Sequence, residues 1–271
     1  MSRSSAQANL ERQLMLARAQ LAMYARDLRM LVHREQRVSR QLKATNLQLR
    51  AYARDLKVAF DAEHRKAREL ERAYADTLLR LTQASRYKDE ETGAHIQRLS
   101  HYARTLARSL GLSPEEVRLI AEAAPMHDVG KVGIPDAILR KPGPLTPSEW
   151  AIVKRHPEIG ANLLAGSPSR LIEMARSIAL THHERWDGSG YPAGLKGERI
   201  PLAGRIVMFV DTYDALRSRR PYKKPLSHRT VCDILLNGNG RTRPSHFDPR
   251  LLETFSQIHE AFAQIFARTA D

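Results

Sequence analysis

The sequence predicts an all-α protein in which a long N-terminal coiled-coil helix precedes a helical domain. Three observations support this prediction. The first glycine is Gly93 and the first proline is Pro114, so the opening segment lacks the residues that break helices. Apolar residues recur in that segment every seven residues. Beyond residue 87, helix-start signals occur, whereas strand-like alternation bounded by turns does not.

Residues 1–86 carry the heptad pattern of a coiled coil. Two mainly apolar registers form a narrow seam rather than the broad face of a globular helix. The pentapeptide YARDL occurs at 24–28 and again at 52–56, four heptads apart, which keeps the register. One register consists of Leu14, Leu21, Leu28, Leu42, Leu49, Leu56 and Leu70, with Glu35 and Glu63 as interruptions, and the other of Ala17, Tyr24, Leu31, Val38, Thr45, Tyr52 and Ala59.

The seam predicts that residues 1–86 form a dimerisation helix, so a homodimer is expected. Leu70, Tyr74, Leu78 and Leu81 drift off the earlier register, as expected where a helix joins a globular domain. We therefore expect a boundary near residue 86 and a second domain over residues 87–271. Because neither part resembles a receiver or sensor domain, an upstream sensor or regulator protein is a further candidate partner.

The second domain contains two clear helix starts. Ser113 and Thr146 each precede a proline and stand three residues before a glutamate, which is the pattern of an N-cap with a capping box. Helices are expected over 93–110, 117–128, 147–166, 170–182, 202–216 and 248–267.

The formal net charge of +14 raises the question of an anionic partner. Residues 1–86 hold 18 Lys and Arg against 9 Asp and Glu, so about +9 of this charge lies in the first third of the chain. Acids are interleaved with these bases, which favours a solvated helix surface. Nucleic-acid binding is the weaker alternative.

The cysteine content and the N-terminus predict a soluble cytoplasmic protein. The single cysteine, Cys232, lies in an apolar stretch and is expected to be buried filler, which fits a reducing compartment. The first residues lack the apolar region of a signal peptide, and the chain has no run of ~18 apolar residues.

Histidines and carboxylates stand together in apolar helical segments, where an unpartnered ionisable group would be costly. Glu91 and His95 are four residues apart, so a helix would place them on one face. His127 and Asp128 close an apolar segment, and Lys131 follows three residues after the acid. A surface contact for the first pair and a buried salt bridge for the second group remain simpler explanations.

Further candidate ligands lie at one expected helix boundary and at the ends of two apolar runs. His156 precedes Pro157 at an expected boundary. His182 and His183 close the apolar run SIALT, and Asp211 ends the run IVMFVD, whose apolar residues should bury it. Taken singly, each has a plain alternative as a helix-end residue or a hydrogen-bonded core residue.

Taken together, these histidines and carboxylates form a donor set of nitrogen and oxygen without thiolates. Such a set suits iron, manganese or another first-row ion with carboxylate bridging better than it suits a cysteine-rich structural zinc. The number of candidates favours two or three divalent ions. The eight candidate ligands are Glu91, His95, His127, Asp128, His156, His182, His183 and Asp211.

At these residues the chain resembles the HD-GYP phosphodiesterases, a branch of the HD hydrolase superfamily, over roughly residues 86–265. An HD pair followed by lysine is shared by many HD hydrolases, whereas the string HHERWDGSGYP is highly specific. The matching strings are KDEETGAHIQRLS at 88–100, HDVGKVGIPD at 127–136, KPGPLT at 141–146, HPEIG at 156–160, HHERWDGSGYP at 182–192, DTYDAL at 211–216 and RPYK at 220–223.

The resemblance implies that all eight candidates ligate metal, with Asp128 bridging two ions and Glu91 associated with a third. It also implies catalytic roles for Asp128 and Lys131. Substrate contacts are implied for Lys131, Arg220 and Lys223, which match phosphate-contacting cations, and for Tyr191 in the loop at 190–192.

For function, the resemblance implies hydrolysis of cyclic di-GMP to linear pGpG, to GMP or to both, by metal-activated hydroxide. Two departures from the family pattern bear on substrate preference: Arg219 stands where an acid is common, and ProSerHis at 244–246 includes the place of a common Gly-Thr. The alternative is therefore a catalytically weak effector that binds a cyclic dinucleotide and signals through its coiled coil.

Overall fold

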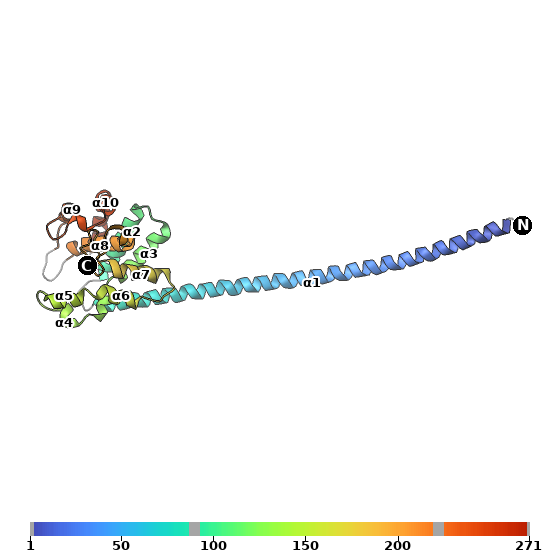
Figure 1. Ribbon diagram of the computed structural model, residues 1–271, viewed down its shortest axis with the longest axis horizontal. Helices are drawn as coiled ribbons and strands as arrows, with labels where there is room; N and C mark the ends of the chain where they lie inside the picture. Colours follow the sequence, from blue (N-terminus) through green and yellow to red (C-terminus); the bar gives the residue numbers. More distant parts are fainter. Residues whose placement is uncertain (1–2, 87–92, 219–224, 270–271) are drawn as a thin grey trace. The chain divides into compact units, whose positions relative to one another are not determined.

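The structure is a computed structural model that describes residues 3–86, 93–218 and 225–269. The side chains of residues 3–8, 71, 75, 78, 79 and 81–86 lie outside that description. The backbone forms two compact units, Met1–Glu69 and Leu70–Asp271. The all-α prediction is confirmed, because the regular elements of the described residues are α-helices and short 3₁₀-helices (Figure 1).

Helix α1 (Arg3–Arg86) runs without interruption for 84 residues (Figure 1), which confirms the predicted long helix. The leucines of its heptad register are exposed, with Leu21 at 68% and Leu56 at 72%. Most helical stability in water comes from burying an apolar face rather than from intrinsic propensity. The uncovered seam therefore marks α1 as a helix suited to pack against another chain.

The second unit consists of short and medium helices. Its α-helices after α1 are α2 (Gly93–Ser109), α3 (Pro114–Ala123), α4 (Asp136–Leu139), α5 (Pro147–Val153), α6 (His156–Leu163), α7 (Arg170–Thr181), α8 (Leu202–Arg217), α9 (His228–Asn237) and α10 (Pro249–Arg268). Its 3₁₀-helices are η1 (Ala124–Met126), η2 (Val129–Gly133), η3 (Gly197–Arg199) and η4 (Pro244–His246).

Both predicted capping boxes are confirmed. The Ser113 hydroxyl accepts a hydrogen bond from the Glu116 amide at 3.3 Å, and the Glu116 carboxylate accepts one from the Ser113 amide at 3.0 Å. Thr146 and Glu149 repeat this arrangement at the start of α5. These reciprocal bonds satisfy amides that would otherwise lack partners in the first helical turn.

Several predicted helix boundaries were wrong. The helix expected over 117–128 begins at Pro114, as the capping box at Ser113 predicted, but it gives way early to η1 around Pro125, which cannot donate a helical hydrogen bond. The helix expected over 147–166 is two helices, α5 and α6, because Pro157 favours a helix start rather than a helix interior. Helices α4 and α9 were not predicted.

The core of the second unit is built around α8. Its Phe209 and Tyr213 pack against Phe255 and Phe262 of α10, and all four side chains are fully buried. Tyr102 of α2 stacks on Phe262 with ring centroids 4.7 Å apart. Burying each aromatic side chain contributes roughly 1.5–3 kcal/mol. The packing holds α8 rigidly, and the same helix carries acidic side chains that face α2.

Candidate metal centre

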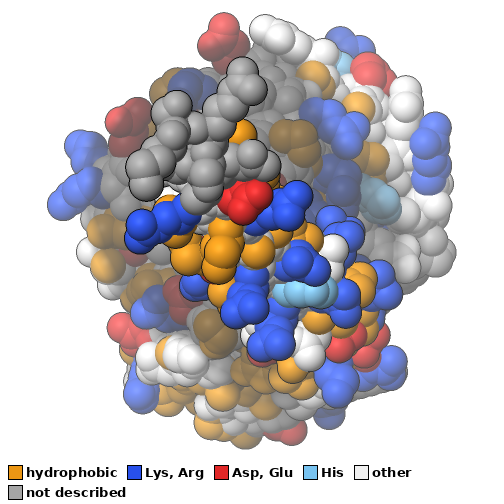
Figure 2. Space-filling view, turned by 90° about the vertical axis from the view of Figure 1, so that its right-hand side faces the viewer, with side chains coloured by type: hydrophobic (Ala, Val, Ile, Leu, Met, Phe, Trp, Pro, Cys, Tyr) orange, Lys and Arg blue, Asp and Glu red, His pale blue; other side chains and the backbone are white. Residues whose placement is uncertain are grey.

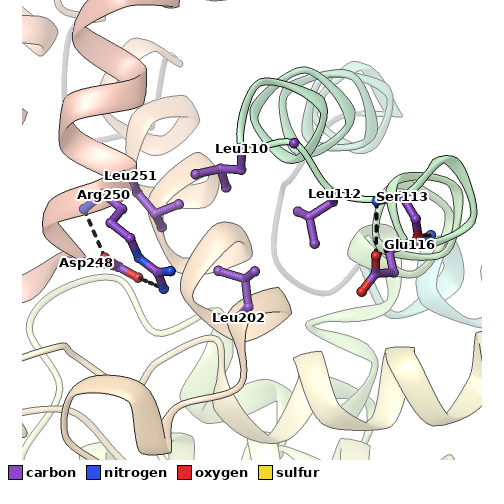
Figure 3. Close-up of a pocket in the computed structure, with 9 residues that line it drawn as sticks. Leu110, Leu112, Ser113, Glu116, Leu202, Asp248, Arg250 and Leu251 are labelled. Carbon is purple, nitrogen blue, oxygen red and sulfur yellow. Dashed lines mark hydrogen bonds and ion pairs between the residues drawn. The ribbon is translucent and has the colours of Figure 1, made fainter.

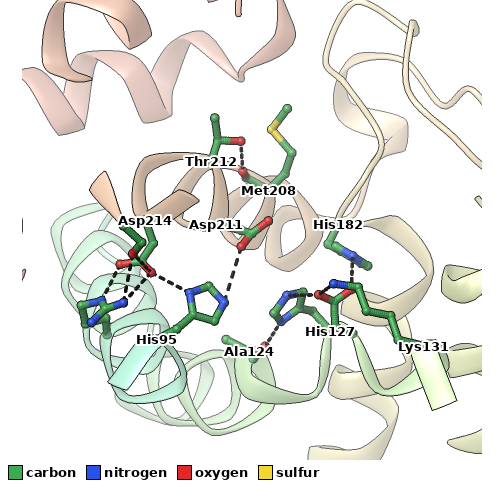
Figure 4. Close-up of polar contacts among 12 residues, drawn as sticks. His95, Ala124, His127, Lys131, His182, Met208, Asp211, Thr212 and Asp214 are labelled. Atoms are coloured by element: carbon green, nitrogen blue, oxygen red, sulfur yellow. Dashed lines mark hydrogen bonds and ion pairs between the residues drawn. The ribbon is translucent and has the colours of Figure 1, made fainter. Parts of the chain in front are cut away.

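Histidines and acids from distant parts of the second unit converge at one place. His95 comes from α2, His127 and Asp128 lie between η1 and η2, and Asp211 comes from α8. Figure 4 shows His95 and Asp211 pointing toward each other, with His127 nearby and Lys131 beside His127. The remaining members are His156, the first residue of α6, and His182 and His183, which follow α7.

One group of candidate ligands surrounds Asp128. Ligand atoms of Asp128, His156, His182 and His183 all lie within 4.8 Å of one another. Nε2 of His156 lies 3.1 Å from Asp128 Oδ1 and 3.3 Å from Nε2 of His182. The side chains of Asp128, His156 and His182 are buried, and that of His183 is half-buried.

A second group adjoins the first. His95, His127 and Asp211 also place ligand atoms within 4.8 Å of one another, and His95 Nε2 lies 3.7 Å from Asp211 Oδ1. His127 Nε2 lies 3.1 Å from Asp128 Oδ2. Asp128 therefore stands between the two groups, with one carboxylate oxygen toward each. Such a placement suits a bridging carboxylate.

Hydrogen bonds on the outer ring nitrogens orient three of the histidines. Nδ1 of His127, His156 and His182 contacts the carbonyl oxygens of Ala124 at 2.9 Å, Val153 at 2.8 Å and Ala179 at 2.9 Å, respectively. Because a carbonyl oxygen only accepts, each Nδ1 must carry the proton and each Nε2 has a lone pair directed into the cluster. This is the tautomer that metal ligation requires.

The outer ring nitrogen of His95 contacts a carboxylate instead of a backbone carbonyl. Its Nδ1 lies 2.6 Å from Oδ2 of Asp214, which is itself fully buried. Arg98, one turn further along α2, donates to both oxygens of Asp214 at 2.7 and 3.1 Å. Sequence reasoning missed both partners. The spacing of Asp214 three residues after Asp211 on one helix was the available signal.

The protonation states also fit divalent cations. Burial, followed by the neighbouring His182 and His156, holds the pKa of His183 well below its usual value, and burial lowers the pKa of His182. Burial alone would raise the pKa of Asp128, but the positive charge of Lys131 is the largest opposing effect, and this pKa lies well below its usual range. Neutral imidazoles around an ionised carboxylate are the forms that bind metal. The donor set and its geometry are therefore compatible with divalent metal binding.

Gly130 permits the close approach that brings His156 to Asp128. A Cβ atom at this position would collide with the carbonyl oxygen of His156 and with the amide of Gly160 in α6. The glycine in the string HDVGK thus allows η2 to lie directly against α6. Without that contact, the first group of ligands would be pushed apart.

The loop after His183 folds back over the cluster. Glu184, which sequence reasoning missed, is buried and accepts hydrogen bonds from the amides of Ala193 at 2.8 Å and Leu195 at 2.9 Å. The Tyr191 amide donates to the carbonyl of His183 at 3.2 Å, and the Tyr191 ring stacks on the His183 ring with centroids 4.7 Å apart. The loop therefore places Tyr191 against a candidate ligand.

The remaining site predictions have mixed outcomes. Lys131 lies beside the cluster, with Nζ 2.7 Å from Asp128 Oδ2. Asp211 is not buried as predicted: its side chain is 22% exposed, because it lies on the face of α8 toward the cluster and not on the core face. His95 is buried rather than a surface residue. Glu91, Arg219, Arg220 and Lys223 lie outside the described residues.

Two other surface features lie apart from this centre. A hollow of about 300 Å³ is lined by Leu110, Leu112, Leu202 and Leu251 (Figure 3), and no candidate ligand borders it. On the face in Figure 2, Lys and Arg side chains are mixed with hydrophobic and acidic ones.

Comparison with known proteins places this geometry in a family. The sequence profile described as HD domain matches residues 78–251, which include the described candidate ligands. The chain belongs to the HD domain family. Together with the relatives described next, this match confirms the predicted resemblance to the HD-GYP phosphodiesterases.

Several proteins that are similar in sequence to this chain are named phosphodiesterases. The cyclic di-GMP phosphodiesterase response regulator RpfG of Xanthomonas campestris pv. campestris is 48% identical over 195 residues, covering 72% of this chain and 50% of the relative. A cyclic di-GMP phosphodiesterase of Vibrio cholerae is 44% identical over 207 residues, covering 72% and 41%. A 3'3'-cGAMP-specific phosphodiesterase 2 of the same species is 44% identical over 191 residues, covering 70% and 36%.

The chain thus spans half or less of the length of these relatives. Among solved structures, a cyclic GMP-AMP specific phosphodiesterase of V. cholerae, V-cGAP3, superposes with a TM-score of 0.52 at 18% identity, covering 73% of this chain and 51% of the other. This likeness shows a shared fold.

Within the described residues, no helix is both long and apolar enough to span a membrane.

Proposed function

We propose that the chain is a phosphodiesterase that hydrolyses a cyclic dinucleotide, with cyclic di-GMP as the first candidate substrate. The observation that carries this proposal is the pair of ligand groups that adjoin where Asp128 contacts His127, next to the amino group of Lys131. Relatives named for cyclic di-GMP and for 3'3'-cGAMP support this substrate class. The products proposed are linear pGpG, GMP or both.

We propose that two divalent ions bind here, one in each ligand group, with Asp128 between them. Iron or manganese suits the donors, which are nitrogen and oxygen without a thiolate. A third ion would require Glu91, which lies outside the described residues. Ions bound here would supply Lewis acidity toward the attacking water and the phosphoryl oxygens.

The chain's own residues would bind and orient the substrate. Lys131 holds a positive charge beside Asp128 and would offset negative charge on phosphoryl oxygens. Arg220 and Lys223 are proposed to do the same. Tyr191, stacked on His183, presents a rigid wall that suits a sugar or a base.

Product analysis tests this proposal. The chain would be purified anaerobically, loaded with iron or manganese, and incubated with cyclic di-GMP and separately with 3'3'-cGAMP, with metal content measured on the same sample. We expect conversion to the linear dinucleotide or the mononucleotides. Asp128→Ala and His127→Ala should abolish turnover, whereas His101→Ala, at an exposed position of α2, should retain it. Undiminished turnover by Asp128→Ala would reject the site.

The alternative of a catalytically weak effector draws on the unusual segment at 244–246. Ser245 donates to the carboxylate of Asp187 at 3.1 Å, and the Trp186 amide donates to the carbonyl of His246 at 2.9 Å. This segment therefore braces the loop that carries Tyr191. Tight nucleotide binding by a sample that holds two ions, with no product after long incubation, would select the effector.

We further propose that α1 joins two copies of the chain as a coiled coil. The exposed heptad leucines support this proposal, because pairing would remove them from water. An upstream sensor or regulator protein acting on the coiled coil is the proposed source of the input signal.

A further inference from the structure

A second group of metal-ligating side chains lies where α9 packs against α10. His228 begins α9, Cys232 lies one turn later on the same helix, and His259 lies on α10. Their ligand atoms all lie within 4.8 Å of one another, and all three side chains are half-buried. None of the three belongs to the candidate metal centre.

The distances within this group match those around a tetrahedral zinc ion. Bonds of about 2.0–2.1 Å to nitrogen and about 2.3 Å to sulfur separate two nitrogen ligands by roughly 3.3 Å, and a nitrogen from a sulfur by roughly 3.6 Å. Here His228 Nε2 lies 3.1 Å from His259 Nδ1 and 3.5 Å from Cys232 Sγ. The third pair, the Cys232 sulfur and a ring nitrogen of His259, lies within 4.8 Å.

A neighbouring hydroxyl orients the first imidazole. The Tyr213 hydroxyl lies 2.9 Å from Nδ1 of His228. If that nitrogen donates to the hydroxyl oxygen, Nε2 carries the lone pair toward His259 and Cys232. Hydrogen bonding of the outer nitrogen is a usual feature of metal-bound histidine, and the rigid aromatic core of α8 fixes Tyr213.

The charges around the group are compatible with a cation. Burial, and then the neighbouring His259, lower the pKa of His228. The carboxylate of Glu260 lies 3.6 Å from Nδ1 of His259. The nearby cation Arg217 donates to the Leu226 carbonyl at 2.8 Å and lies over the Phe266 ring.

We propose that His228, Cys232 and His259 bind a zinc ion, with water or the carboxylate of Glu260 in the fourth position. Two imidazoles and a thiolate favour zinc over the harder ions that suit the candidate metal centre. The ion would join α9 to α10 and, through Tyr213, would contact α8. Its role is structural, and it does not depend on the proposed phosphodiesterase activity.

The competing explanation is a hydrogen-bonded cluster without an ion. One proton between His228 Nε2 and His259 Nδ1 would satisfy both rings, and Cys232 would then remain a thiol. The two explanations differ in the state of the sulfur. A zinc site requires a thiolate bonded to the ion, whereas the hydrogen-bonded cluster leaves the thiol reactive toward alkylating agents.

Cobalt(II) is the probe for the first experiment. A thiolate bound to Co²⁺ gives an intense near-ultraviolet charge-transfer absorption that imidazole and carboxylate ligands do not give. Because the chain has a single cysteine, this absorption reports on Cys232 alone, even when the candidate metal centre also binds cobalt. We expect the absorption in the full chain and its loss when zinc is added.

Variants make the cobalt experiment decisive. Cys232→Ser should abolish the absorption, His259→Ala should weaken cobalt binding by about tenfold or more, and the exposed His101→Ala should change neither. All of these positions are at least partly exposed, and circular dichroism would check their folding. No absorption at saturating cobalt, or unchanged affinity in His259→Ala, would overturn the proposal.

Thiol alkylation gives a second, independent readout. Zinc should slow the reaction of Cys232 with iodoacetamide in the full chain and equally in Asp128→Ala, which retains this site while losing a ligand of the candidate metal centre. An alkylation rate that is the same with and without zinc in both proteins would overturn the proposal.

Discussion

At the scale of single residues, the outer nitrogen of His95 is distinctive. His127, His156 and His182 each donate to a neutral backbone carbonyl, whereas His95 contacts the buried carboxylate of Asp214. A carboxylate in this place fixes the ring orientation and makes the imidazole a stronger ligand. We therefore propose that Asp214 is a positioning residue that would act on a bound metal through His95.

Asp214→Asn should therefore have two effects. The free energy of unfolding should fall by about 3–5 kcal/mol, because Arg98 would keep a buried charge without its ionic partner. Metal affinity should fall by about 10–100-fold, because the imidazole loses its carboxylate. Urea unfolding measures the first effect, and equilibrium dialysis of the folded variant with manganese measures the second.

Asp55→Asn, at an exposed position of α1, is the matched control and should change neither quantity. Wild-type metal affinity in Asp214→Asn would show that Asp214 serves stability alone.

At the scale of elements, α5 begins with an ion pair attached to its capping box. Lys141 Nζ contacts both carboxylate oxygens of Glu149, at 2.9 and 2.7 Å. The hydrogen bond from Lys141, followed by that from the Thr146 amide, lowers the pKa of Glu149 from 4.5 to about 2. One carboxylate therefore joins the preceding loop to the first turn of α5.

This pKa predicts a pH dependence of stability. Because the folded-state pKa of Glu149 lies below its unfolded value, the ionised carboxylate stabilises the fold above pH about 4.5, and this contribution is lost as the pH falls toward 2. The urea midpoint of the wild type should exceed that of Glu149→Gln at neutral pH. The difference should shrink as the pH is lowered from about 5 toward 2.

Ser148→Ala, in the same helical turn, is the non-titrating comparison. Its difference from the wild type should stay constant over that range of pH. A constant difference for Glu149→Gln as well would contradict the assignment of the pH dependence to this carboxylate.

Helix α1 offers a matched pair of leucines for testing the coiled coil. Leu49 lies on the heptad register, whereas Leu47 lies off both registers, and the two are similarly exposed at 59% and 68%. Leu49→Lys should shift the full chain toward monomer in sedimentation, because pairing would bury the charge. Leu47→Lys should leave the distribution unchanged, since leucine and lysine have similar helix propensities. Equal distributions for the two variants would exclude this seam as the dimer contact.

At the scale of the whole molecule, the candidate metal centre joins segments that are remote in sequence. His95 and Asp211 meet from α2 and α8, while Asp128, His156 and His182 bring the η1–η2 junction to α6 and α7. An ion that binds only the folded arrangement must stabilise it. The domain boundary at residue 86 stays a prediction, and the two backbone units divide in sequence between Glu69 and Leu70.

Chelation should therefore lower the stability of the second unit. At a free metal concentration about one hundred times the dissociation constant, the stabilisation is about 2.7 kcal/mol. Removal of manganese by a chelator should lower the urea midpoint of the wild type accordingly, as followed by circular dichroism. In Asp128→Ala the midpoint should be nearly insensitive to manganese, and a shift as large as that of the wild type would place the stabilising ion elsewhere.

Local patterns in the sequence were sufficient for several features of this protein. The run without Gly or Pro predicted α1, and two capping boxes predicted the starts of α3 and α5. The helix end at Pro125 was missed, whereas the boundary expected at Pro157 is confirmed, although the range 147–166 was drawn across it. Helix α9 was missed, although Ser227 caps it through a hydrogen bond from the Thr230 amide at 3.1 Å.

The sequence by itself determined which side chains of the candidate metal centre can act as ligands, because residue type is a local property. Only the tertiary structure decided which of these side chains meet. Asp214 lies 119 residues from His95, and His259 lies 31 residues from His228. Such contacts depend on how the helices pack around Phe209 and Tyr213, and sequence periodicity alone does not specify that packing.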